Sequence, residues 1–181
     1  MFNLNDEKEF NTGGSIFNGG NTGLVKNVKI SVEKRPEGTN QPHYKLVATD
    51  TAGSVNQGFY YPEPNPQKDA AANEKTAKMN VGRVLHAAKA VMGDDYVFPE
   101  VSSAKEAYDT LFKLIEENSK DKLFNVYVTY GTKDRPSQYL GLRFFDFIEA
   151  ATENTKLYPK AVDMMEQVSA DTPKGNSDSW I

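Results

Sequence analysis

Cysteine is absent from this chain of 181 residues, and tryptophan occurs only once. Without cysteine there is no disulfide framework, no thiolate nucleophile and no zinc–sulfur site. No apolar run approaches the roughly 18 residues of a membrane span, and the first residues lack the basic and then apolar pattern of a secretory leader. We therefore expect no membrane partner and a cytoplasmic location.

Sequence signatures of enzymes are also scarce. The two histidines, His43 and His86, have no motif around them, and a surface strand position and a helix flank are the simpler interpretations. Asp94 and Asp95 offer carboxylates to a cation, but no further oxygen ligands follow at a recognisable spacing. No GxxxxGK[ST] motif is present, and the glycines of GGSIFNGGNTG neither follow a strand nor open a helix. We expect a protein that is not an enzyme and holds no metal or cofactor.

The composition is that of an ordinary globular domain, with 38% hydrophobic and 25% charged residues. The net charge is −4, and six acids against three bases from Glu149 onward account for −3 of it. The other 148 residues therefore carry −4 − (−3) = −1. A nearly neutral body does not indicate a strongly basic binder of duplex DNA.

Five segments show the alternation of apolar and polar residues that predicts half-buried strands. They lie at residues 24–34, 43–50, 54–61, 123–130 and 138–145. The predicted inward residues include Val28, Ile30 and Val32 in the first segment, Tyr44, Leu46 and Ala48 in the second, and Phe124, Val126, Val128 and Tyr130 in the fourth. GTKDRPS is predicted to be the hairpin loop between the last two strands.

Residues 62–121 change to a helical period. Asn73 is the predicted N-cap of a first helix, which Gly93 closes. Ser103 and Glu106 have capping-box spacing at the head of a second helix. After Glu149 the chain turns polar, and the pattern predicts at most a short amphipathic helix that starts near Pro159.

The order of elements predicts a mainly β (α+β) fold: a five-stranded, OB-fold-like antiparallel barrel with a two-helix insertion between strands three and four. Other β-meanders with a helical insertion would give the same order. The predicted organisation is a Gly/Asn-rich arm at 1–23, an OB-fold domain at 24–149 with its insertion at 62–121, and a polar, mildly acidic tail at 150–181.

The residues that alternate with the predicted core are unusual for a solvated face. Applying one parity rule to all five strands collects four aromatic residues and three cations: Lys29, Lys45, Tyr60, Tyr127, Tyr139, Arg143 and Phe145. The loops between strands add further cations: Lys34, Arg35, Lys133 and Arg135. Rings that stack on bases and cations that meet phosphates are typical of a platform for single-stranded nucleic acid. The alternative is that the same rings pack beneath the helical insertion.

The pattern YKLVATD…GFYYPE, a helical insertion, and FNVYVTYGT…YLGLRFFDF followed by a polar tail resembles the bacteriophage single-stranded DNA-binding proteins. The resemblance covers roughly residues 24–149 and the last few positions. It implies an OB-fold that coats exposed single strands in phage DNA replication and recombination, in the host-cell cytoplasm. The tail departs from the family, because it is only weakly acidic.

The end of the printed sequence, SDSWI, suggests a second contact. Trp180 and Ile181, preceded by Asp178, form a small apolar anchor with an anionic flank that suits a basic-rimmed hydrophobic pocket on a replication or recombination protein. The alternative is that Trp180 packs against the body or a neighbouring subunit, as in a homodimer.

Two rival functions remain at this stage. One is a non-enzymatic virion or assembly protein that uses the same barrel to bind protein. The other is a nuclease or another hydrolase, for which the sequence shows no carboxylate or histidine cluster.

Overall fold

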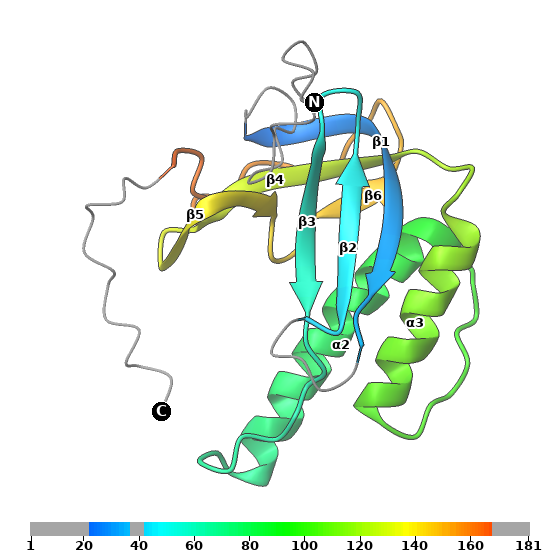
Figure 1. The fold of residues 1–181 in the computed structure, drawn as a ribbon, viewed down its shortest axis with the longest axis vertical. Helices are drawn as coiled ribbons and strands as arrows, with labels where there is room; N and C mark the ends of the chain where they lie inside the picture. The colour runs from blue at the N-terminus through cyan, green and yellow to red at the C-terminus, as the bar shows by residue number, and fades with distance from the viewer. Residues whose placement is uncertain (1–21, 37–41, 168–181) are drawn as a thin grey trace, which may run out of the picture.

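The computed structural model describes residues 22–36 and 42–167, and the fold is mainly antiparallel β. The five main strands are β1 (Gly23–Lys34), β2 (Tyr44–Thr49), β3 (Ser54–Phe59), β4 (Phe124–Thr132) and β5 (Arg135–Leu142). They lie in the order β3-β2-β1-β4-β5, and the short β6 (Ile148–Ala150) pairs with β4. The sheet curls into a half-barrel, as Figure 1 shows.

The curl depends on β1, which pairs with both β4 and β2. Its first part pairs with β4 as far as Val28, and its second part pairs with β2 from Lys29 onward. The register shifts between Val25 and Val28, where Asn27 adopts a left-handed φ of 59°. A bulge of this kind bends a strand and increases its twist, and this allows one strand to turn the corner of the barrel.

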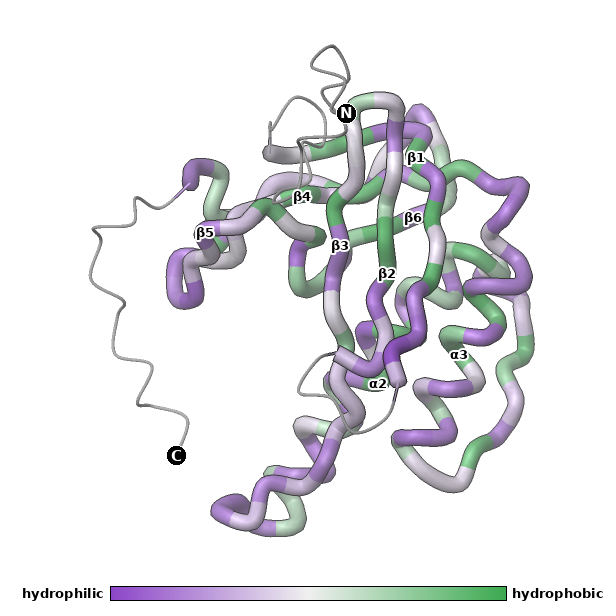
Figure 2. The backbone as a smooth tube through the Cα atoms, in the orientation of Figure 1, coloured by the Kyte–Doolittle hydropathy of each residue, from purple (hydrophilic) through white to green (hydrophobic). Residues whose placement is uncertain are grey.

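The predicted alternation is confirmed in the first two strands. Val28 and Ile30 of β1 and Tyr44, Leu46 and Ala48 of β2 are all buried in one hydrophobic core. Figure 2 shows apolar and polar residues alternating along both strands. The inner face of the half-barrel is therefore the core face, and the intervening residues point away from it.

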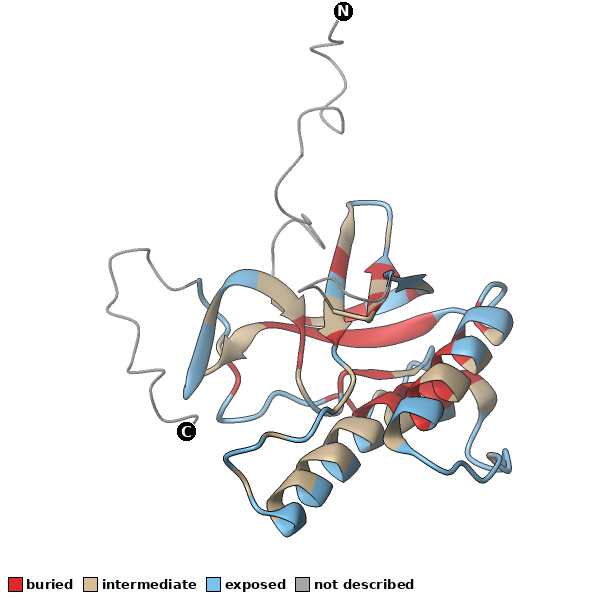
Figure 3. Cartoon of the chain, turned by 60° about the horizontal axis from the view of Figure 1, so that its bottom comes forward, coloured by how far each residue is buried: buried red, intermediate tan, exposed pale blue. Residues whose placement is uncertain are grey.

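Two helices pack together against this inner face, where Figure 3 shows their buried residues. The first, α2 (Ala70–Met92), begins after Asp69, whose side chain accepts a hydrogen bond from the Ala72 amide. The predicted cap at Asn73 is therefore wrong, and this side chain instead binds the backbone of Asn65. Gly93 ends α2 with a φ of 90°, as predicted.

The second helix, α3 (Ala104–Asn118), confirms the predicted start. The Ser103 side chain accepts a hydrogen bond from the Glu106 amide at 3.1 Å. The Glu106 carboxylate reaches back to Ser102, one residue earlier than an ideal capping box requires. Among the described residues, no helix is long and apolar enough to cross a membrane.

The segment after β6 differs most from expectation. Residues 151–167 pack along β4, and the Met164 amide and carbonyl bind Gly131 and Tyr130 of that strand. Leu157 and Asp163 are buried, and no helix forms between residues 150 and 167. This agrees with the prediction of at most a short helix near Pro159, but the folded body extends past the boundary placed at residue 149. This segment covers the outer side of β4, whose residues 124–129 are buried on both faces.

Candidate nucleic-acid interface

The outer face, as we call it, consists of the residues of β1, β2, β3 and β5 that point away from the core. Cross-strand pairing sets Lys45 of β2 between Glu33 of β1 and Gly58 of β3. Four residues along, Lys29 lies opposite Thr49. The predicted cations Lys29 and Lys45 therefore lie on one surface, with Lys29 exposed and Lys45 half-buried.

The sheet leaves two tyrosine rings open to solvent along this face. Tyr60 directly follows β3 and is 55% exposed, and Tyr139 on β5 is 73% exposed. Strands β3 and β5 come close at Gly141, where an added Cβ would lie 3.5 Å from the Asn56 carbonyl oxygen. The half-barrel thus brings the strand that carries Tyr139 beside the strand that leads to Tyr60.

The predicted loop cations lie at two edges. Lys34 lies over the Tyr44 ring at 5.6 Å, and Arg35 is within 3.8 Å of the Glu33 carboxylate. The β4–β5 hairpin is tighter than predicted, because Thr132 already pairs with Arg135. This tight turn exposes Lys133 and Arg135 at its tip. Gly131 makes the turn possible, since its φ is 78° and a Cβ there would lie 2.3 Å from the Arg135 carbonyl oxygen.

Two of the predicted contact residues are not accessible. Tyr127 is 3% exposed and Arg143 is 3% exposed, so their predicted solvent exposure is wrong. Their parity is as expected, since both point away from the barrel core. Tyr158 and Asp163 of the segment after β6 bind Arg143, and the Arg143 guanidinium lies over the Tyr127 ring at 4.1 Å.

The Arg143 guanidinium donates four hydrogen bonds inside the protein. Its Nη1 donates to the Asp163 carboxylate at 3.1 Å and to the Tyr158 carbonyl at 2.7 Å. Its Nε and Nη2 donate to the carbonyls of Phe145 and Asp146. Arg143 therefore uses four of its five N–H donors to hold the chain after β5 to the segment after β6, and its burial keeps it from a phosphate.

A second buried arginine, Arg83 of α2, holds the same loop from the other side. Its Nε donates to the Phe144 carbonyl at 2.9 Å, and its guanidinium lies 3.5 Å from the Phe144 ring centroid. Burial lowers the pKa of Arg83 to about 10. The Phe144 ring in turn packs edge-on against Phe145, which is 46% exposed. Arg83 is not among the residues predicted from the sequence, although a cation beside Val84 in the apolar stripe of a helix is the signal that marks it.

A second feature that was not predicted from the sequence lies where α3 meets β2. The hydroxyls of Tyr44 and Tyr61 both donate to the Asp109 carboxylate, which also pairs with Lys105 at 3.1 Å. Burial and the hydrogen bonds to Asp109 raise the pKa of Tyr44. Burial alone would raise the pKa of Asp109, but the hydrogen bonds from Tyr44, Tyr61 and Lys105 outweigh it and hold this pKa below its usual value. These hydrogen bonds attach α3 to β2 and to the chain after β3.

The predicted partner-binding residues Asp178, Trp180 and Ile181 lie outside the described residues, as do residues 1–21 of the arm predicted at 1–23. Gly23, the last residue of that predicted arm, is the first residue of β1. Within the described residues, no group of three or more histidine, cysteine or acidic side chains could hold a metal ion.

Comparison with known proteins does not add to this picture. No protein-family model, no curated protein and no solved structure matches the chain.

Proposed function

We propose that this chain is an OB-fold protein that binds single-stranded DNA with little sequence preference, in the replication or recombination of phage DNA. The architecture supports the proposal. A curled five-stranded sheet with the order β3-β2-β1-β4-β5, with β5 close to β3 and helices between β3 and β4, has the connectivity of a partly open OB barrel. Such barrels bind oligonucleotides on their outer strands and loops.

The single observation that carries the proposal is the pair of solvent-exposed rings, Tyr60 and Tyr139. Both rings have more than half of their surface exposed, so they are available for stacking. A base can stack on each ring whatever its identity, because every base has a π-face. Lys29 and Lys45 on the same face and Lys133 and Arg135 on the hairpin supply the phosphate contacts in this proposal.

The proposal is tested by fluorescence-anisotropy titration of the full chain with labelled oligo-dT and with a duplex, each at two salt concentrations. We expect tighter binding to oligo-dT, with an affinity that falls as salt rises because neutralised phosphates release counterions. Equal or stronger duplex binding, or no binding at low salt, contradicts it.

Variants of the exposed rings locate the site. Tyr139→Ala and Tyr60→Ala should each weaken oligo-dT binding by about 1–3 kcal/mol, the usual value of a base–aromatic stack, with little change in stability. Tyr96→Ala is the matched control, because Tyr96 is exposed on the loop between α2 and α3, away from the outer face. Equal losses in all three variants would rule out the outer face.

A further inference from the structure

Three residues lie side by side where β1 and β3 end and β2 begins. The β1–β2 and β2–β3 ladders both end at the buried Tyr44, and the next residues of the three chain segments are Arg35, His43 and Tyr60. The Arg35 amide donates to the His43 carbonyl at 2.8 Å, and the rings of His43 and Tyr60 meet edge-on with centroids 6.5 Å apart. Because side chains alternate along a strand, the residues next to Tyr44 and its partners point to the outer face.

The His43 ring is held in place by the chain after β3. Its Nδ1 accepts a hydrogen bond from the Tyr61 backbone amide at 3.1 Å, and the two rings pack with centroids 4.1 Å apart. A ring nitrogen that accepts a hydrogen bond carries no proton, so the neutral ring carries its proton on Nε2. Within the described residues this Nε2–H has no partner. His43 therefore presents one oriented N–H donor beside the exposed Tyr60 ring.

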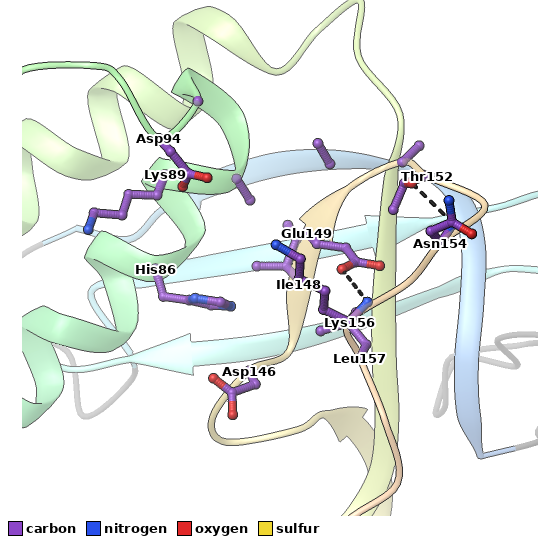
Figure 4. A pocket seen from close by; sticks show the side chains of 14 residues that line it. His86, Lys89, Asp94, Asp146, Ile148, Glu149, Thr152, Asn154, Lys156 and Leu157 are labelled. Carbon is purple, nitrogen blue, oxygen red and sulfur yellow. Dashed lines mark hydrogen bonds between the residues drawn. The ribbon is translucent and has the colours of Figure 1, made fainter.

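The other histidine, His86 of α2, presents no such donor. It lines a cavity of about 590 Å³ between α2 and β6, and Figure 4 shows its ring directed toward β6. The ring packs edge-on against Phe147, and its Nε2 is buried without a hydrogen-bond partner in the described part of the chain. His43 Nε2 is not among these buried atoms. Of the two, His43 is the histidine that can meet a ligand at the outer face.

The charges beside His43 suit a phosphate group. The Arg35 guanidinium lies within 3.8 Å of the Glu33 carboxylate, and Lys45 is the cross-strand neighbour of Glu33. Two cations thus accompany this carboxylate on the outer face. A phosphate oxygen accepts hydrogen bonds from a neutral N–H and from a guanidinium alike. Because one sugar joins a base to its phosphate, a base stacked on Tyr60 brings a phosphate close to His43.

We propose, on the basis of the function proposed above, that His43 is a further contact residue for single-stranded DNA. The base of one nucleotide stacks on Tyr60, and an oxygen of its phosphate accepts hydrogen bonds from His43 Nε2 and from the Arg35 guanidinium. All nucleotides share the phosphate group, so this contact adds affinity without adding sequence preference.

NMR of the histidine rings tests the contact in the unmodified chain. Long-range ¹H–¹⁵N spectra of the ¹⁵N-labelled full chain are recorded at about pH 8, above the usual range of histidine titration, with and without oligo-dT. We expect His43 to carry its proton on Nε2 and its ring signals to shift on binding. The signals of His86 are the internal control and should not move. A proton on Nδ1 of His43, or His43 signals that stay in place at saturating oligo-dT, would overturn the proposal.

Two variants of His43 separate contact from positioning. The Asn amide of His43→Asn lies near the place of Nδ1 and can still accept from the Tyr61 amide, whereas that of His43→Gln lies near the place of Nε2 and can still donate. We expect His43→Asn to weaken oligo-dT binding about fivefold or more, and His43→Gln to bind more tightly than His43→Asn. Thermal melting shows that both variants are folded. An Asn variant that binds as tightly as the parent, or no more weakly than the Gln variant, contradicts a direct contact.

The salt dependence distinguishes the neutral donor from its charged neighbour. His43→Asn should leave the slope of log affinity against log salt unchanged, because a neutral N–H releases no counterion. Arg35→Gln should reduce this slope by about 1. A slope that falls with His43→Asn, or stays the same with Arg35→Gln, is evidence against the shared phosphate.

The two proposals fail in different ways. A parent chain that does not bind oligo-dT overturns both. If the parent binds and Tyr60→Ala weakens the binding, but the His43 signals do not move, only the His43 contact is wrong.

Discussion

The direction predicted for the Arg143 side chain is confirmed, but the solvent exposure predicted for it is wrong. It points away from the barrel core, as its parity predicts, but it forms a buried ion pair with Asp163, whose side chain is 1% exposed. A guanidinium that satisfies three carbonyls and a carboxylate stabilises the fold rather than a bound strand.

We expect Arg143→Ala to lower the free energy of unfolding by about 3–5 kcal/mol, because it leaves the Asp163 carboxylate buried without its cation. Urea unfolding followed by circular dichroism measures this loss. Lys133→Ala, a change at an exposed cation, should stay within about 0.5 kcal/mol of the parent chain. An Arg143→Ala protein with unchanged stability and weaker oligo-dT binding would restore the phosphate-binding role.

At the scale of elements, α3 is attached to the sheet by polar groups as well as by apolar packing. Asp109 accepts from two tyrosine hydroxyls that belong to β2 and to the chain after β3. Because the pKa of Asp109 in the folded state lies below its usual value, its contribution to stability is present above that usual value, about 3.9. The contribution is lost as the pH falls through the lower, folded-state pKa.

Asp109→Asn should therefore reduce the free energy of unfolding by about 1–2 kcal/mol at neutral pH, since charged hydrogen bonds are partly screened at a residue about one-third exposed. The difference from the parent chain should shrink as the pH falls through the lowered folded-state pKa of Asp109, because its carboxyl group then becomes neutral like the Asn side chain. Denaturant unfolding at about pH 7 and at a series of lower pH values measures it. Asp121→Asn, at an exposed position after α3, is the control. A difference that persists unchanged at low pH would show that the carboxylate charge is not responsible.

At the scale of the whole molecule, the segment after β6 belongs to the folded body. It hydrogen-bonds to the end of β4 through Met164, and it supplies Asp163 to Arg143, whose guanidinium lies over the Tyr127 ring. Without this cover β4 would expose its outward residues Asn125, Tyr127 and Thr129, which are buried in the folded chain.

Two truncated chains test this role. A chain ending at residue 149 should lose about 10 °C or more in melting temperature, because it lacks the buried partner of Arg143 and the cover of β4. A chain ending at residue 167 retains every described contact and is the matched control. Differential scanning calorimetry compares both with the full chain, and equal melting temperatures would show that residues 150–167 do not stabilise the body.

The sequence alone determined the elements whose signals are local. The alternation in β1 and β2, the Ser103 cap and the Gly93 stop depend on residues a few positions apart, and all appear in the structure. The first cap was misplaced because Asp69 and Asn73 both have capping side chains, and only the tertiary position of the chain after β3 engages Asn73 with Asn65.

Only the tertiary structure decided which outward residues meet solvent. Parity gives the direction of a side chain from its own strand, but exposure depends on what the rest of the chain lays over that strand. Tyr139 and Tyr127 follow the same parity, and the first is 73% exposed while the second is 3% exposed. The difference comes from the Arg143 guanidinium, which lies over the Tyr127 ring and is held by Tyr158 and Asp163. These two residues belong to the segment 151–167, whose polar composition carries no local signal of burial. Their cover over β4 arises from an ion pair between residues 20 positions apart and from backbone hydrogen bonds to a strand about 30 residues earlier.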